Sequence, residues 1–489
     1  RRSGAGASTM ASMFLVNHNI EDVPVLVVGA GPAGLAAATE LTRHGVPALV
    51  VERRTVLSSH PRATVLSLRS MELMRGWGLE GAVRERSAEV DFSMLETETL
   101  AGAAGGSAIE VGYPSTEQSR VLSPVEPACV AQDEVEPLLL ANLRDQPSVR
   151  VALGLELTGV SVGPDGARAE LRDVTTGEVR QVRARFVVAA DGAHSAVRRA
   201  VGLAMPGTED VMEGRTTLLR APLWDVVGPH RHLLYVVTHK EAPAVFVPAG
   251  PSDRWLFGLL DEGAQAGGQG RTEELVRLAA GAPGLPVRIE RSRSFSSAAQ
   301  LAECFRRGPV FLAGDAAHRV TPRGGTGLNL ALHDGFDLGW KLAWVLRDWA
   351  SPALLDSYET ERRPVAEHAV VRSADPGGSR RAPEQEVHAD LGGRIPHVWS
   401  GERSTLDLLG TGLTLFAGPD GSAWNEAAAS LASRVPVNVR LLDAMAARAV
   451  GAAGGSALLV RPDGKPAGVL PAGAEPAPAL PAAVAAIAA

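Results

Sequence analysis

The stretch from Val23 to Glu52 constrains the fold of this chain more than any other. An apolar run at Val25–Val28 has the composition of a buried parallel strand, and a G-x-G-x-x-G motif follows at positions 29–34. An alanine-rich segment then predicts a helix, and Ala48–Val51 predicts a second strand that ends at Glu52. This order is typical of a dinucleotide-binding βαβ unit, and the alternative is a Gly-rich turn that serves only packing.

Each residue of the motif has a physical role in such a unit. Gly29 permits the tight turn, Gly31 lets the backbone approach a pyrophosphate, and Gly34 lets the helix pack closely on the strand. Ala33 lies in the first helical turn, where free N–H groups would face an anion. Glu52 is placed to accept hydrogen bonds from ribose hydroxyls, so the sequence predicts a cofactor site built from these residues.

Composition limits the class of protein. The 489 residues suffice for about two or three domains, and a net charge of −7 predicts neither nucleic acid nor an anionic membrane as a partner. No apolar run approaches the ~20 residues of a membrane span. Two cysteines, Cys129 and Cys304, form no disulfide framework, which favours a reducing cytoplasm, and no metal-ligand cluster is found. Residues 1–21 are interpreted as a disordered tag remnant.

Two further strands end in an acid. Phe186–Ala190 leads into Asp191, and an apolar run from Pro309 leads into Asp315. Acids at the carboxyl ends of strands lie where open α/β sheets bind ligands. The loop from Pro322 to Gly327 then precedes a long predicted helix, and a Gly-rich loop before a helix presents free N–H groups at a positive dipole end.

Residues 205–300 alternate apolar and polar positions and predict a mostly antiparallel sheet that covers the cofactor. Tyr235, Phe246 and Phe257 are candidates for a flat apolar substrate pocket on this sheet. The alternative is that they pack the sheet against its own predicted helix at 272–280.

Several polar residues are weaker candidates for cofactor contacts. Arg53 and Arg62 follow the second strand, where a guanidinium can neutralise a pyrophosphate; Arg62 is the better candidate, and a solvated arginine is the alternative. Gln132 could hydrogen-bond the cofactor and Glu136 could tie its helix internally, or both could be ordinary polar residues at a helix start.

Three motifs together resemble those of one family. They are G-A-G-P-A-G with the acid Glu52 at the end of the unit, Asp191-Gly192, and Gly314-Asp315 followed by P-x-G-G-x-G-L-N. They are similar to those of the FAD-dependent aromatic hydroxylases of the para-hydroxybenzoate hydroxylase fold, the class A flavoprotein monooxygenases. The resemblance covers about residues 23–370 and is closest to aromatic polyketide hydroxylases, such as aklavinone-11-hydroxylase and the angucycline oxygenases, on the strength of the segment Asp334–Ala343.

The resemblance implies an α/β fold with a Rossmann-like FAD domain, an antiparallel β-sheet substrate domain and a C-terminal thioredoxin-like domain. The expected divisions are 22–90, 126–204 and 301–373 for FAD, 91–125 and 205–300 for substrate, 374–403 as a linker, and 404–489 for the last domain.

It also implies residue roles. Gly29, Gly31 and Gly34 would hold the FAD pyrophosphate and Glu52 the ribose, while Arg62 and Gln132 would contact the pyrophosphate region. Asp191 is associated with FAD and NAD(P)H, and Asp315 with the ribityl chain. The expected contacts to the isoalloxazine ring are Pro322 and the backbone of 324–329, which includes Gly325, Gly327, Leu328 and Asn329. The family pattern is broken at Thr326, where relatives often have Gln or Met.

The implied activity is hydroxylation of a polycyclic aromatic polyketide through a flavin C4a-hydroperoxide, with FAD as cofactor, NADPH or NADH as transient reductant and O2 as co-substrate. No catalytic side chain is assigned, and His318 is interpreted as structural. The alternatives are Baeyer–Villiger or ring-opening oxidation and a non-enzymatic ligand-binding protein; a flavin halogenase is disfavoured because W-x-W-x-I-P is absent. A monomer or a homodimer is expected.

Overall fold

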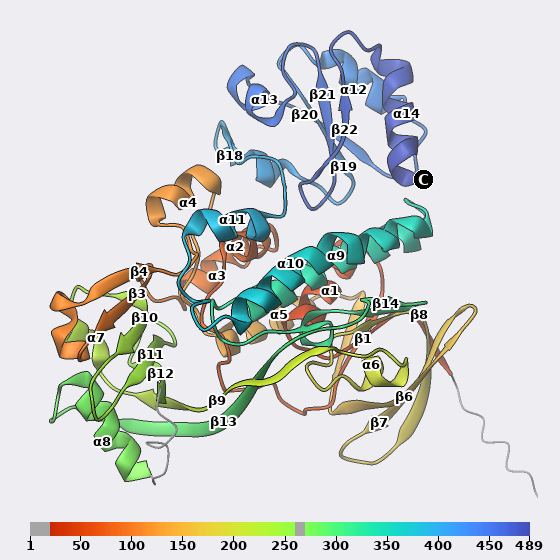
Figure 1. Cartoon of the computed structure of the whole chain (residues 1–489). Helices are drawn as coiled ribbons and strands as arrows, with labels where there is room; N and C mark the ends of the chain where they lie inside the picture. Colours follow the sequence, from red (N-terminus) through yellow and green to blue (C-terminus); the bar gives the residue numbers. More distant parts are fainter. Residues whose placement is uncertain (1–19, 260–268) are drawn as a thin grey trace, which may run out of the picture.

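The computed structural model describes residues 20–259 and 269–489 (Figure 1). The predicted disordered segment 1–21 falls almost entirely outside these residues, but Glu21 already begins the first strand. Among the described residues, no helix is long and apolar enough to cross a membrane.

The first sheet has the order β14-β15-β8-β1-β2-β5, with β6 and β7 attached through β8. Its central strands β15, β8, β1, β2 and β5 are parallel, so their carboxyl ends meet at one edge. The strands are β1 (Glu21–Val28), β2 (Ala48–Glu52), β5 (Val149–Leu153), β6 (Leu155–Gly163), β7 (Gly166–Asp173), β8 (Val179–Ala189), β14 (Arg306–Arg307) and β15 (Val310–Leu312).

Helix α9 lies against α1, which follows β1. A Cβ atom added at Gly335 of α9 would lie 2.1 Å from the carbonyl oxygen of Ala33, so the glycine allows the two helices to approach closely. Every residue of α9 from Leu328 to Val345 is buried, which is typical of a helix covered on all sides rather than of one with a single apolar stripe. The helices of this region are α1 (Pro32–Arg43), α2 (Leu68–Gly76), α3 (Glu80–Arg84), α5 (Gln132–Arg144), α6 (Ala196–Ala200), α9 (Gly327–Leu346) and α10 (Asp356–Ala374).

The second sheet has the order β16-β13-β9-β12-β11-β10-β3-β4 and is mostly antiparallel. The long strands β9 and β13 of the second sheet run side by side and extend toward the first sheet (Figure 1). The elements are β3 (Asp91–Thr97), β4 (Ser107–Glu110), α4 (Thr116–Leu122), β9 (Gly207–Arg220), α7 (Leu223–Val227), β10 (His232–Val237), β11 (Ala244–Pro248), β12 (Arg254–Leu259), α8 (Gln269–Ala280), β13 (Arg288–Leu301) and β16 (His318–Arg319).

The C-terminal unit has a four-stranded sheet of order β20-β19-β21-β22, with β19 and β20 parallel and the other pairs antiparallel. Helices flank this sheet, as expected of a thioredoxin-like unit (Figure 1). The elements are β17 (Trp399–Ser400), β18 (Arg403–Ser404), β19 (Leu413–Ala417), α12 (Ser422–Ala429), β20 (Val437–Leu441), α13 (Ala444–Val450), β21 (Ala457–Val460), β22 (Pro466–Leu470) and α14 (Pro476–Ala488).

The predicted linker, 374–403, is more than a connection, because it contains helix α11 (Pro383–Leu391), which packs against α2. The side chain of Arg394 is buried within the same segment and pairs with Glu72 of α2. A buried ion pair of this kind fixes the segment to the first part of the chain, so its Gly- and Pro-rich composition does not mean that it is loose.

Candidate functional site

Four of the predicted cofactor positions meet at one edge of the first sheet. Glu52 is the last residue of β2, and Gly29, Asp191 and Asp315 follow β1, β8 and β15; these four strands are neighbours in the parallel part of the sheet. The carboxyl edge of such a sheet is where α/β proteins bind ligands.

The three motif glycines differ in what surrounds them. Gly29 has a φ of +107°, and a Cβ atom there would lie 2.2 Å from the carbonyl oxygen of Ala190; a Cβ atom at Gly34 would lie 1.9 Å from the carbonyl oxygen of Gly29. A Cβ atom at Gly31 would meet no described atom within 4 Å. Two glycines therefore serve close packing, and Gly31 leaves open space at the N-terminus of α1, which fits the approach of a pyrophosphate.

The two acids nearest this turn are used differently. Glu52 accepts hydrogen bonds from the backbone N–H groups of Ala30 (3.1 Å) and Arg54 (3.0 Å), and so sits beside the glycine turn. Asp191 accepts from the Ser195 hydroxyl (2.5 Å) and the Ala196 N–H (2.7 Å) and thereby caps α6. Its carboxylate is largely occupied by this structural role.

Asp315 has an exposed side chain in the turn after β15. Among the described residues, nothing hydrogen-bonds to its carboxylate, so it is free to accept from a ligand. The Asp334 carboxylate of α9 fixes this turn, because it accepts a hydrogen bond from the N–H of Gly314 (3.0 Å). The same carboxylate accepts from His318 Nε2 (2.6 Å) and from Arg362 Nε (2.8 Å). Burial alone would raise the pKa of Asp334, but the charges of His318 and Arg362 outweigh it and lower that pKa. The pairing agrees with a structural role for His318.

Side chains fix the glycine loop before α9, residues 322–327, by hydrogen bonds to its backbone carbonyl groups. Gly324 and Gly325 have φ values of +85° and +63°, a backbone that other residues adopt only with strain. Arg372 donates to the Gly324 carbonyl (3.1 Å), and Asn329 Nδ2 donates to the Gly325 carbonyl (3.2 Å). The hydroxyl of Thr326 is buried and has no hydrogen-bond partner among the described residues.

Two predicted ring contacts, Leu328 and Asn329, have buried side chains, so only their backbone can face a ligand. The Asn329 side chain instead fixes the loop to α2, because its Oδ1 atom accepts from the Ser67 N–H (2.9 Å) and the Ser70 hydroxyl (2.7 Å). Pro322 is exposed at the start of the loop, whereas Gly325 and Gly327 are partly buried.

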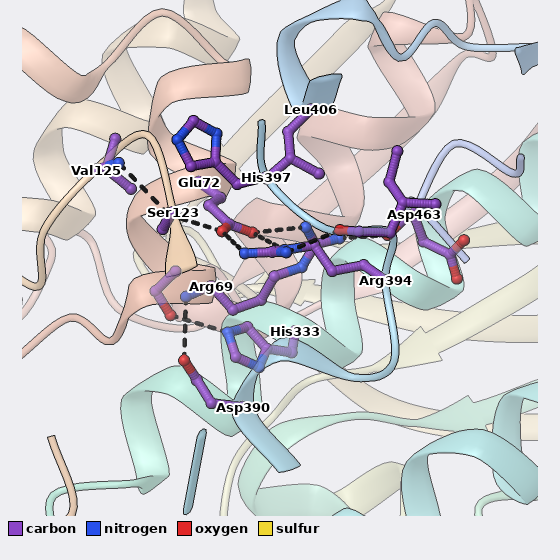
Figure 2. A network of polar contacts seen from close by, with 12 residues as sticks. Arg69, Glu72, Ser123, Val125, His333, Asp390, Arg394, His397, Leu406 and Asp463 are labelled. Carbon is purple, nitrogen blue, oxygen red and sulfur yellow. Dashed lines mark hydrogen bonds and ion pairs between the residues drawn. The ribbon is translucent and has the colours of Figure 1, made fainter. Parts of the chain in front are cut away.

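Helix α2 is in turn tied to the C-terminal unit (Figure 2). Arg69 donates to Glu72 (3.0 Å) and to the carbonyl oxygen of Asp463 in the turn between β21 and β22 (2.8 Å), and its N–H donates to Asp390 of α11 (3.1 Å). Burial would raise the pKa of Glu72, but Arg394 and Arg69 lower it. The glycine loop is therefore connected to the C-terminal unit through α2.

The remaining polar candidates are dispersed. Arg53 and Arg62 are exposed. Gln132 is buried, and its amide donates to Glu136 (2.6 Å), so the internal tie within α5 is present and a cofactor contact from the same N–H group is excluded. Burial raises the pKa of Glu136.

The predicted aromatic pocket is wrong. Tyr235, Phe246 and Phe257 are at most 2% exposed and form one apolar cluster with Leu275 and Val276 of α8. They pack the sheet against its own helix, and a substrate cannot reach them.

The residues next to these aromatics lie on the opposite face of the sheet. We define the substrate-side face by five partly buried apolar side chains of β10, β11 and β12: Leu234, Val236, Val245, Val247 and Leu256. Leu256 and Leu218 pack on Ala131 at the start of α5, so this face looks toward the first sheet. Strand alternation is the sequence property that could have identified it.

A cavity of about 260 Å³ lies beside this face, between the loop at Ser59, the start of α5 and the second sheet. Within it Arg254 pairs with Asp133 and Arg220 with Glu290. Arg291 in the cavity lining and Arg293 two residues further have no carboxylate partner in the described part of the chain.

His60 lies near these two arginines. It is 6% exposed, its Nε2 atom is 3.4 Å from the Thr216 hydroxyl, and its Nδ1 atom has no partner among the described residues. Burial and the positive charges of Arg293 and Arg291 lower the pKa of His60. The sequence analysis did not single out Arg291 and Arg293.

Three carboxylates outside the cofactor edge lie close together, those of Asp337, Glu361 and Asp463. The fully buried Lys341 amine is 2.7 Å from Asp337 and 3.3 Å from Glu361, and Arg461 pairs with both Glu361 and Asp463. These cations neutralise the carboxylates, so the group is an ion-pair network between α9, α10 and the C-terminal unit rather than a metal site.

Comparison with known proteins gives the family. The model of an FAD binding domain matches residues 22–373, and that of the C-terminal part of aromatic-ring hydroxylases matches 388–488. Tetracenomycin A2 monooxygenase-dioxygenase of Streptomyces glaucescens is 34% identical over 91% of this chain and 92% of its own. A 4-methyl-5-nitrocatechol 5-monooxygenase of Burkholderia is 32% identical over 91% and 93%.

A solved structure of aklavinone-11 hydroxylase with FAD and aklavinone superimposes with a TM-score of 0.83 at 31% identity, covering 96% of this chain and 99% of that one. Together with the glycine turn, the exposed Asp315 and the open loop before α9, these matches show that the chain belongs to the FAD-dependent aromatic-ring hydroxylases and is a flavin-dependent monooxygenase.

Proposed function

We propose that this chain uses FAD, NAD(P)H and O2 to hydroxylate a polycyclic aromatic polyketide. The observation that carries the proposal is the apolar substrate-side face, which is partly buried and packs through Leu256 on Ala131 at the start of α5, a helix of the FAD part. A flat aromatic substrate fits between an apolar sheet and a flavin ring. The S. glaucescens relative and aklavinone-11 hydroxylase, both named for polyketide substrates, support the substrate class.

In this proposal the open space at Gly31 and the N-terminus of α1 take the FAD pyrophosphate, and Glu52 accepts from the ribose. Asp315 accepts from the ribityl chain, and the loop from Pro322 to Asn329 lies along the ring. The FAD part comprises 22–90, 126–204 and 301–373, and the part that covers the substrate comprises 91–125 and 205–300. Arg62 is retained as a candidate for the pyrophosphate.

When bound, FAD supplies the redox and oxygen-transfer chemistry, and the protein positions its partners. The N–H groups at the start of α9 and the positive end of its dipole stabilise negative charge on the ring, because reduced flavin is anionic. The cavity at Arg291 receives the phosphate groups of the reductant, since Arg291 and Arg293 offer guanidinium groups that no carboxylate neutralises.

A second type of reaction has support of its own. The S. glaucescens relative is named for a dioxygenase as well as a monooxygenase activity, so Baeyer–Villiger or ring-opening oxidation of a polyketide ketone or quinone is the alternative. The nitrocatechol monooxygenase relative shows that a single-ring substrate also belongs in any screen.

The test is NADPH oxidation by the FAD-loaded protein with tetracyclic polyketide aglycones and nitrocatechols, followed by mass and NMR analysis of the products. Stimulated oxidation with one oxygen added at an aromatic carbon supports the proposal. A lactone or an opened ring supports the alternative, and turnover of the nitrocatechols alone overturns the substrate class.

The cofactor placement has its own test. Gly31→Val introduces side-chain atoms into the open space and is expected to abolish FAD binding, measured by flavin fluorescence. Gly81→Val is the control, because a Cβ atom there also meets nothing within 4 Å but lies in α3. Normal FAD affinity in Gly31→Val would exclude the proposed placement.

A further inference from the structure

Tyr113 connects the segment after β4 to the glycine loop. Its hydroxyl donates to the Gly325 carbonyl (3.2 Å), and a Cβ atom at Gly325 would lie 3.1 Å from that same hydroxyl oxygen. Tyr113 is itself fixed: its neighbour Gly112 donates to the carbonyl oxygen of Arg381 (2.8 Å), and its ring packs 6.1 Å from Phe92 of β3. The loop and the substrate-covering sheet are therefore in direct contact through one side chain.

The carbonyl group that Tyr113 holds determines where the next N–H group points. A trans peptide is planar, so the Gly325 carbonyl and the Thr326 N–H point in opposite directions. Tyr113 and Asn329 both donate to the Gly325 carbonyl, while Arg372 holds that of Gly324. The Thr326 N–H therefore points away from Tyr113 and Asn329. The Thr326 hydroxyl beside it is buried and has no hydrogen-bond partner among the described residues.

We propose that Tyr113 is a positioning residue for the flavin, which acts by fixing the Gly325 peptide so that Thr326 offers its N–H to the ring. The proposal rests on the placement of the flavin ring along this loop. It connects the substrate-covering sheet to the reduction potential of the flavin, since hydrogen-bond donors near the ring stabilise the reduced, anionic flavin.

Burial keeps Tyr113 a donor. Its pKa is raised mainly by burial, against the lowering effect of Arg372, and Asp390 and Glu386 raise it further. A raised pKa favours the protonated phenol, which is the form that donates to the loop.

The experiment compares Tyr113→Phe with Tyr235→Phe. Both remove a partly or fully buried hydroxyl that donates to a backbone carbonyl, but Tyr235 donates to His230 (2.9 Å) in the cluster under α8. Tyr113→Phe is expected to raise the FAD dissociation constant about three- to tenfold, to make the flavin reduction potential more negative and to shift the visible flavin band. Tyr235→Phe is expected to lower the thermal midpoint and to leave all three flavin properties at wild-type values.

A wild-type reduction potential and FAD affinity in Tyr113→Phe would overturn the proposal, whatever the thermal midpoint. If that variant does not fold, Arg372→Lys tests the same loop: it keeps a cation beside Glu386 but loses the planar fork that reaches the Gly324 carbonyl, which also lies 3.5 Å from the Tyr113 hydroxyl, and the same outcomes apply. Failure of Gly31→Val to affect FAD binding would instead count against the cofactor placement, so the two failures are distinguishable.

Discussion

The Nε2 atom of His318 lies 2.6 Å from the Oδ2 atom of Asp334, and both side chains are almost fully buried. Asp334 belongs to α9, and the same Oδ2 atom accepts from the N–H of Gly314, directly before Asp315. One carboxylate thus holds the turn that presents the exposed acid at the cofactor edge, and its other oxygen, Oδ1, accepts from Arg362 Nε.

Asp334→Asn is expected to lower the free energy of unfolding by about 3–5 kcal/mol at pH 7, because it leaves Arg362 buried without its anion. The pKa of Asp334 is lowered in the folded state, so its contribution is present above the unfolded pKa of about 3.9 and is lost as the pH falls below it. Urea unfolding at pH 7 and pH 3.5 should show the difference between variant and wild type shrinking. Asp22→Asn, at an exposed pair with Arg183, should change little at either pH. A constant difference would contradict the assignment.

The first sheet and its acids were predictable because their signals are local: an apolar strand, a glycine turn and a terminal acid lie within 30 residues of each other. The orientation of the second sheet was not. Both faces of β10 are apolar, with Leu234 and Val236 on one and Tyr235 and Val237 on the other, so the alternation alone cannot tell which face meets α8.

The contacts that fix α2 and α11 also escaped the sequence analysis. Asp390 and Arg69, and likewise Glu72 and Arg394, are more than 300 residues apart in the chain, and no periodic pattern links them. Such pairings follow from the packing of the whole chain, and the Gly- and Pro-rich composition of 374–403 conceals them.

Val236 and Val237 are adjacent and offer a matched test of the two faces. Val236→Ala, on the substrate-side face, is expected to raise the KM for the aromatic substrate a few-fold and, because Val236 is only partly buried, to lower the free energy of unfolding less than Val237→Ala does. Val237→Ala, in the cluster under α8, is expected to lower the free energy of unfolding by about 1–3 kcal/mol with KM unchanged. Steady-state kinetics and urea unfolding of both variants check this, and the reverse pattern would show that the substrate uses the other face.

The buried carboxyl group of Asp390 should give the free energy of unfolding an unusual pH dependence. Burial raises its pKa to about 6, although the Ser67 side chain and the Arg69 N–H donate to it. The folded state therefore binds more protons than the unfolded state between about pH 4 and 6, and this group's contribution to stability falls as the pH rises through that window. Relative to wild type, Asp390→Asn should gain up to about 3 kcal/mol between pH 4 and pH 7, measured by urea unfolding.

Asp443 provides the control of opposite sign for Asp390. It caps α13, and its pKa is lowered by the hydrogen bond from the Ala446 N–H first, then by the Ser400 side chain. Asp443→Asn should therefore lose stability relative to wild type as the pH rises toward about 4, the unfolded pKa, and should lose no more above it. An Asp390→Asn variant whose stability relative to wild type does not change with pH would show that Asp390 titrates normally.

Arg291 and Arg293 should determine the affinity for the reductant. Arg291 lines the cavity beside the substrate-side face, and Arg293 lies two residues further along β13 on the same face of the sheet. No carboxylate among the described residues neutralises either guanidinium group. Arg293→Gln and Arg291→Gln are each expected to raise the KM for NADPH roughly tenfold with kcat at saturating NADPH unchanged, because a charged hydrogen bond to phosphate contributes about 1.5–3 kcal/mol. The KM of the wild type should rise with added salt more steeply than that of either variant, since salt screens exposed charges.

Arg288→Gln is the control for these two variants. It removes an exposed arginine of the same strand, one that already pairs with Glu290, and it should leave the KM for NADPH unaltered. If Arg288→Gln raises that KM as much as Arg293→Gln does, the reductant is attracted by the net charge of the strand, and the cavity is not its docking site.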